Sequence, residues 1–167
     1  MVVMNITLIG MSGVGKSRIG RLLSRKLNYH YLDIDRLIEQ RNNKKLQELI
    51  DCLGDEKFLE VEENAILSIG MANNSVISSG GSAIYSERAM KFLNSISKIV
   101  FLNTSLEEIK ARTGNFSRRG IVGLKEKGLE RLFEERLPFY KRYADITVDI
   151  KDFDAELIAN IIIERVM

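Results

Sequence analysis

Residues 10–17 read G-M-S-G-V-G-K-S, a glycine-rich run that ends in a lysine and a hydroxyl. This spacing matches the pattern G-x-x-x-x-G-K-[ST], which is typical of loops that bind phosphate groups. Glycine permits backbone conformations in which successive amides point at one anion, and a helix that starts in the loop adds the positive end of its dipole. Lys16 supplies a charge for the terminal phosphates, and the Ser17 hydroxyl is a ligand for Mg²⁺. We therefore expect the phosphates of a nucleotide to be bound by Gly13, Val14, Gly15, Lys16 and Ser17.

Two carboxylates, Asp33 and Asp35, follow an apolar stretch and are separated by one residue. On an extended strand this spacing points both side chains to the same side. One carboxylate can serve Mg²⁺, directly or through water, and the other can accept a proton from a substrate hydroxyl. Gly80 and Gly81 would let a substrate approach the backbone closely. The alternatives are a polar strand end that caps the next helix and a plain glycine turn.

Three arginines, Arg112, Arg118 and Arg119, lie in or beside a segment at about residues 114–127 that is rich in glycine, arginine and lysine. Phosphoryl transfer depends mainly on positioning and on neutralising the charge of the phosphate oxygens. A lid that closes there would bring arginines over the phosphates and would exclude water from the reaction. A solvated basic loop is the alternative interpretation.

The remaining pattern predicts the elements that position these residues. Short apolar stretches predict strands at residues 5–9, 30–35, 75–78, 98–102 and 146–150. Helical spacing of apolar residues predicts helices over 16–28, 36–43, 46–53, 58–70, 86–93, 105–112, 129–136 with an interruption at Pro138, and 154–166. This alternation predicts an α/β fold, a five-stranded parallel sheet flanked by helices. Ligands of such sheets bind beyond the carboxyl ends of the strands, where the glycine loop, the two carboxylates and Gly80–Gly81 all fall.

Length and composition restrict the remaining possibilities. The chain has 167 residues, which predicts one domain over residues 1–167. A net charge of +2 indicates no nucleic-acid or membrane surface, and the partner we expect is a small molecule bound by a monomer.

A lone cysteine, Cys52, lies in an apolar helical pattern and is interpreted as a buried residue in a cytoplasmic protein. No stretch is long enough to cross a membrane, and the first four residues lack the basic start of a signal peptide.

The motifs together resemble the shikimate kinase family, small P-loop kinases of the nucleoside-monophosphate-kinase type. The resemblance covers about residues 5–165. It rests on the glycine loop, on L-D-I-D at 32–35, on V-I-S-S-G-G at 76–81, on R-T-G at 112–114 and on E-R-L-P-F-Y at 135–140. It implies a five-stranded parallel sheet, dependence on ATP and Mg²⁺, and transfer of the γ-phosphoryl group to a ring hydroxyl of shikimate in aromatic amino acid biosynthesis.

The resemblance also implies a role for individual positions. Lys16 and the lid arginine Arg119 would contact phosphates, with Arg112 near the nucleotide. Ser17 would ligate Mg²⁺, with Asp33 nearby. Asp35 would hold substrate hydroxyls and act as the base. The backbone of Gly80 and Gly81 would contact the substrate, and Arg136 would bind its carboxylate.

Three positions depart from the family pattern. Leu59 stands where the F-R-x-x-E element has a substrate-binding arginine, Ser82 ends the glycine run, and Gly120 replaces the proline after the lid arginine. Loss of one arm of an arginine clamp costs roughly 2–5 kcal/mol, which is roughly thirty- to several-thousand-fold in affinity. Leucine at this position would favour a substrate that is less polar at that end.

Three hypotheses therefore stay open: a shikimate kinase with a rebuilt acid pocket, a kinase of the same fold for another small hydroxylated compound or a nucleotide, and a nucleotide-binding relative without catalysis. Retention of Lys16, Ser17, Asp33, Asp35 and Arg119 argues against the third hypothesis, because a pure binding protein has no use for an acceptor base.

Overall fold

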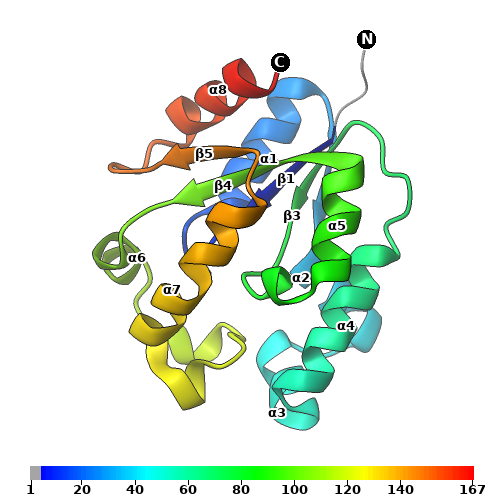
Figure 1. The fold of residues 1–167 in the computed structure, drawn as a ribbon, viewed down its shortest axis with the longest axis vertical. Helices are drawn as coiled ribbons and strands as arrows, with labels where there is room; N and C mark the ends of the chain where they lie inside the picture. Colours follow the sequence, from blue (N-terminus) through cyan, green and yellow to red (C-terminus); the bar gives the residue numbers. More distant parts are fainter. Residues whose placement is uncertain (1–4) are drawn as a thin grey trace.

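A parallel β-sheet runs through the middle of the molecule, with helices on both of its faces (Figure 1). The structure is a computed structural model and describes residues 5–167, so the expectation that residues 1–4 do not begin a signal peptide lies outside it. Within the described range the strands are β1 (Asn5–Ile9), β2 (His30–Asp33), β3 (Ser75–Ser78), β4 (Ser97–Asn103) and β5 (Ile146–Asp149). Their order is β2-β3-β1-β4-β5, and every neighbouring pair is parallel. The predicted sheet is confirmed.

The helices follow the predicted order. They are α1 (Lys16–Leu27), α2 (Ile34–Asn42), α3 (Leu46–Leu53), α4 (Asp55–Leu67), α5 (Glu87–Ile96), α6 (Leu106–Arg112), α7 (Leu124–Tyr143) and α8 (Ala155–Val166), with short 3-10 turns η1 (Ala83–Tyr85) and η2 (Phe116–Arg118). Among the helices of residues 5–167, none combines the length and apolarity needed to cross a lipid bilayer.

The sheet is buried on both faces, and two apolar clusters form the core. Successive side chains of β4 point to opposite faces, so Val100 packs in one cluster and Phe101 in the other. The cluster that contains Val100 is closed by α1 and α8, which lie side by side on one face (Figure 1). The second cluster is closed by helices that include α2, α4, α5 and α7. This covering explains why the central strands read as continuous apolar runs.

Strand β2 ends earlier than the sequence pattern predicts. The pattern predicts a strand to residue 35, but α2 begins at Ile34 and Asp33 is its N-cap. The Asp33 carboxylate accepts a hydrogen bond from the backbone N–H of Arg36 at 3.2 Å. Satisfying a free amide in the first turn favours the helix over one more strand residue. Asp33 and Asp35 therefore do not share one face of a strand, and the alternative of a capping carboxylate is correct for Asp33.

Two other expectations are also wrong. Helix α7 continues through Pro138 to Tyr143, and its break lies at Gly128, where φ is 76° and ψ is 166°. Pro138 is exposed, and burial of Arg136 and Tyr140 on either side stabilises the helix despite the missing N–H. Cys52 is exposed and not buried, because the buried face of α3 is made by Leu46, Leu49 and Ile50.

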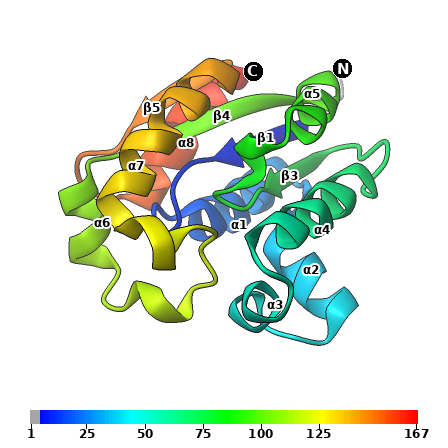
Figure 2. The ribbon, with the colours of Figure 1, turned by 60° about the horizontal axis from the view of Figure 1, so that its bottom comes forward.

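The carboxyl ends of the strands open onto one side of the molecule. Figure 2, in which the bottom of Figure 1 comes forward, shows the loop after β1 between two groups of elements. Helices α2, α3 and α4 lie on one side of it, and α6, the segment after it and the start of α7 lie on the other. Residues distant in sequence therefore meet at this edge of the sheet.

Candidate active site

A cavity of about 360 Å³ lies beyond the carboxyl ends of β1 and β3. Its walls come from the glycine loop, α1, α2, α4, the end of β3, the segment before α7, and α7 itself. The predicted site residues that line it are Gly13, Gly15, Lys16, Ser17, Asp35, Gly80, Gly81, Arg119 and Arg136. Of the other predicted residues, Val14 is buried in the loop, and Asp33 and Arg112 lie next to the cavity without being part of its wall.

The glycine loop has the backbone conformation that its composition predicts. Gly13 and Gly15 have φ of 87° and 103°, values that side-chain-bearing residues rarely adopt. A Cβ at Gly13 would collide with the Thr113 hydroxyl, and one at Gly15 would collide with the ring of Phe153. Gly15 is the N-cap of α1, whose first turn carries no acidic residue and receives no side-chain hydrogen bond as a cap. These amides suit an anion such as a phosphate.

Lys16 is held at the floor of the cavity by its own loop. Its ammonium donates to the carbonyl oxygens of Gly10 at 2.6 Å and Met11 at 2.9 Å. Burial lowers the pKa of Lys16 to about 8, although the negative charge of Asp35 acts in the opposite direction. A bound phosphate would stabilise the charged ammonium, so the site suits a polyanion.

Ser17 and Asp33 form the pair expected for a magnesium site. The Ser17 hydroxyl donates to the Asp33 carboxylate at 3.4 Å, and the Tyr31 hydroxyl donates to the same oxygen at 3.2 Å. Within residues 5–167 no group of three or more His, Cys, Asp or Glu side chains could hold a metal ion. A hydroxyl and a carboxylate are both oxygen ligands of the kind that Mg²⁺ prefers.

Asp35 lies in the first turn of α2 and its carboxyl group faces the cavity. Burial raises the pKa of Asp35 to about 6, with Lys16 opposing that shift and Asp33 adding to it. A carboxylate with a pKa near neutrality can accept a proton from an alcohol that is becoming a nucleophile. The early start of α2 therefore removes Asp35 from the strand but leaves its carboxyl group in the cavity.

Arg136 is a buried cation in the wall of the cavity. It is 1% exposed, and its guanidinium donates to the Val122 carbonyl oxygen at 2.8 Å and to the Tyr85 hydroxyl at 3.4 Å. The guanidinium also lies over the Tyr85 ring, 5.4 Å from the ring centroid. A Cβ at Gly81 would lie 3.0 Å from Nη1 of Arg136, so the backbone of Gly81 packs closely on the guanidinium. Both residues line the cavity, so the guanidinium suits a carboxylate bound on its cavity side.

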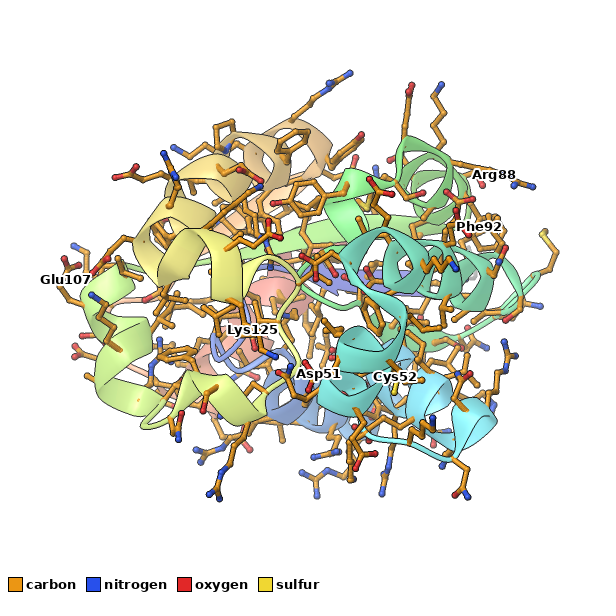
Figure 3. All side chains as sticks on the ribbon, turned by 90° about the horizontal axis from the view of Figure 1, so that it is seen from below. Asp51, Cys52, Arg88, Phe92, Glu107 and Lys125 are labelled. Carbon is orange, nitrogen blue, oxygen red and sulfur yellow. The ribbon has the colours of Figure 1, made fainter. Side chains whose placement is uncertain are left out.

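The segment between α6 and α7 and the start of α7 pack against α3 and α4. The Gly123 amide donates to the Asp55 carboxylate at 3.1 Å, and Lys125 forms an ion pair with Asp51 at 2.6 Å. Figure 3, which shows the molecule from below, has Lys125 and Asp51 next to each other near the centre of the view. This packing places Arg119 and Gly120 in the cavity wall, whereas Arg118 is exposed and outside it.

Arg112 lies beside the glycine loop and not over the cavity. Its guanidinium stacks on the Phe153 ring at 5.0 Å, and Arg18 lies over the same ring at 5.2 Å. The buried Nη1 of Arg112 has no hydrogen-bond partner among residues 5–167. An aromatic ring and a guanidinium next to a phosphate loop form a surface on which a flat nucleobase can stack.

The residues that the sequence did not predict for the site include Glu62 in the cavity wall and, behind it, Tyr85 and Phe153. Glu62 lines the cavity and accepts a hydrogen bond from Ser82, Tyr85 supports Arg136, and Phe153 packs on Arg112. Glu62 carried a signal, because it ends the segment aligned with the F-R-x-x-E element. Phe153 and Tyr85 carried none, because a single aromatic residue outside any motif is indistinguishable from an ordinary core residue.

Comparison with known proteins assigns the chain to a family. The family model described as shikimate kinase matches residues 12–167. The chain belongs to the shikimate kinase family. Shikimate kinase 1 of Yersinia pestis is 35% identical over 162 residues, which is 95% of this chain and 94% of that protein.

Solved structures of shikimate kinases share the fold over nearly the whole chain. Shikimate kinase from Acinetobacter baumannii in complex with shikimate has a TM-score of 0.90 at 27% identity, covering 98% of this chain and 93% of that one. Shikimate kinase from Aquifex aeolicus has a TM-score of 0.83 at 30% identity, covering 96% and 95%. The comparisons therefore confirm two predictions from the sequence: membership of the shikimate kinase family and the P-loop kinase fold.

Leu59 is a departure from the shikimate kinase family pattern that the structure accommodates by packing. Its side chain packs against the apolar cluster that contains Phe58, and it is not among the residues of the described chain that line the cavity. Position 59 therefore supplies no cation to the cavity, and Arg136 remains as the buried guanidinium in its wall.

Proposed function

We propose that the protein transfers the γ-phosphoryl group of ATP to a ring hydroxyl of shikimate. The observation that carries the proposal is the single cavity that brings together Lys16, Asp35 and Arg136. A phosphate-binding lysine, a carboxylate base and a cation for the acid group of the acceptor are the parts that this reaction needs. The related protein from Acinetobacter baumannii was solved in complex with shikimate, which supports the same acceptor here.

The glycine loop would bind the phosphates of ATP through the amides of residues 13–17, with Lys16 against the terminal phosphates. Ser17, with Asp33 behind it, would hold Mg²⁺. When bound, the ion neutralises charge on the phosphate oxygens. Arg112 and Phe153 would support the nucleobase of ATP. Arg119 would contact the γ-phosphoryl group from the lid.

Asp35 and Arg136 would hold the acceptor across the cavity. Arg136 binds its carboxylate, and the backbone of Gly80 and Gly81 contacts the ring. Asp35 accepts the proton of the attacking hydroxyl as its oxygen forms a bond to the γ-phosphorus. The bond from that phosphorus to the β–γ bridging oxygen breaks, and ADP leaves with the electron pair.

We further propose that residues 1–167 act as one domain in which the segment at about 114–127 is a mobile lid. Arg118 and Arg119 in this segment are exposed, and its polar contacts to α3 and α4 include the Lys125–Asp51 ion pair at the surface, which a segment that opens could break and re-form. A monomer in the cytoplasm and the absence of nucleic-acid binding stay predictions from the sequence.

A second candidate function is phosphorylation of another small hydroxylated acceptor or a nucleotide, which Leu59 favours by leaving fewer cations for a carboxylate. A coupled ADP-release assay with shikimate, gluconate, other polyols and nucleoside monophosphates separates the candidates. We expect strong and selective turnover with shikimate. Selective turnover with another acceptor would support the second candidate, and ATP binding without turnover on any acceptor would indicate a non-catalytic relative.

A further inference from the structure

The carboxyl group of Glu62, on α4, is buried in the cavity wall and takes no part in the steps above. Glu62 is 2% exposed. It forms no ion pair with any residue between 5 and 167. Burying a carboxyl group without a cation is costly unless hydrogen bonds satisfy it. The contacts of the two carboxyl oxygens of Glu62 therefore indicate the function of this side chain.

Ser82 supplies the partner of the first oxygen. Its hydroxyl donates to Oε1 of Glu62 at 2.7 Å, and Ser82 itself is 6% exposed. Both residues line the cavity. Leu59 lies one turn earlier on the same helix but packs into the apolar cluster, so it offers Glu62 no charge. The serine that ends the glycine run thus fixes the orientation of the carboxyl group.

The second oxygen lies against Gly80, another residue of the cavity wall. A Cβ at Gly80 would collide with Oε2 of Glu62 and would lie 2.9 Å from Oδ1 of Asp35. The two carboxyl groups therefore approach the same α-carbon. The charged groups that act on Glu62 are Asp35, Arg136 and Lys16, which all line the same cavity.

We propose that Glu62, oriented by Ser82, determines acceptor specificity by accepting a hydrogen bond from a hydroxyl of the acceptor that does not react. Ser82 is a positioning residue that acts through Glu62. The inference rests on the proposed function, because it adds a contact to the same acceptor. It names the acceptor class as a polyol with one carboxylate, which Arg136 binds, and with hydroxyls directed at Asp35 and Glu62. A second carboxylate or a phosphate at this wall would face two carboxyl groups and be rejected.

The test compares Glu62→Met and Ser82→Ala with the wild type in steady-state kinetics on shikimate and on shikimate analogues that each lack one non-reacting hydroxyl. The matched control is Ser86→Ala, because Ser86 donates at 2.5 Å to Glu63 on the same helix and both lie outside the cavity wall formed by the described residues. We expect Glu62→Met to raise the KM for shikimate roughly ten- to a hundredfold. Ser82→Ala should raise it about three- to tenfold, with the KM for ATP unchanged and kcat little changed.

The analogues decide whether the effect is a hydrogen bond to one hydroxyl. With the analogue that lacks this hydroxyl, we expect wild type and Glu62→Met to have equal KM values. An unchanged KM for shikimate in both cavity variants, or an equal rise for every analogue, overturns the inference while leaving the proposed function intact. A wild-type protein that fails to turn over shikimate contradicts the proposed function instead, and the inference with it. If Glu62→Met does not fold, which circular dichroism shows, the Ser82→Ala series alone decides.

Discussion

Burial shifts the pKa values of three ionisable residues that line the cavity. It raises the pKa of Asp35 to about 6 and that of Glu62 to about 7, and it lowers the pKa of Lys16 to about 8. Each group therefore titrates closer to neutral pH than the same residue in water. Such shifts are typical of sites that transfer protons or bind charged substrates.

Asp35→Asn tests the assignment of the base. The amide keeps the size of the side chain but cannot accept the hydroxyl proton. We expect phosphoryl transfer to fall by roughly two to four decades, the usual contribution of a general base, while nucleotide binding persists. The measurements are kcat by ADP release and nucleotide affinity by calorimetry. An unchanged kcat would remove Asp35 from the mechanism.

The pH dependence of kcat/KM for the acceptor tests the same residue independently. Asp35 must be ionised to accept a proton, and its pKa in the folded protein is raised to about 6. Activity should therefore be highest above that value and should fall about tenfold per pH unit below it. A rate that stays flat down to about pH 4.5 would show that no group with this raised pKa takes part.

At the scale of helices and strands, the sequence predicted the sheet and the glycine loop because both follow from local pattern. Apolar runs predict buried strands, and glycines at fixed spacing predict the loop. The end of β2 and the course of α7 were not predictable in this way. For the end of β2, a local contact decides: the Asp33 cap on the Arg36 amide competes with the strand pattern and prevails. For α7, burial of Arg136 and Tyr140 decides, so tertiary contacts override the local preference there.

The lid offers a prediction about an element. Gly120 has φ of 63°, and a Cβ there would lie 2.5 Å from Cβ of Leu46 and 2.8 Å from the Gln47 amide nitrogen on α3. Gly120→Ala should therefore prevent the lid from packing on α3 and displace Arg119, lowering kcat roughly ten- to a hundredfold. Thermal stability should fall as well, because displacing the lid would expose Ile121 and Val122, which are buried beside Gly120.

Gly114→Ala is the matched control, since Gly114 lies in the same segment and a methyl group added to its α-carbon would meet no atom within 4 Å. We expect wild-type turnover from this variant. Equal turnover of Gly120→Ala and Gly114→Ala would contradict closure of the lid against α3.

At the scale of the whole molecule, membership of the shikimate kinase family accounts for the fold, and side chains from distant elements complete the site. Motifs identified the residues that carry fixed spacing, from Lys16 to Arg136. Glu62 and Phe153 were not found, because their roles depend on neighbours that only the fold brings close: Ser82 for the first and Arg112 for the second. The exposure of Cys52 likewise depends on which face of α3 packs inward.

The central claim is that the glycine loop binds the triphosphate while Asp35 and Arg136 hold the acceptor opposite it. A crystal structure with a non-hydrolysable ATP analogue, Mg²⁺ and shikimate tests this most directly. We predict phosphate oxygens on the amides of residues 13–17, a shikimate hydroxyl within hydrogen-bonding distance of Asp35, and the carboxylate on Arg136. Phosphates bound elsewhere, or shikimate seated away from Asp35 and Arg136, would contradict the account.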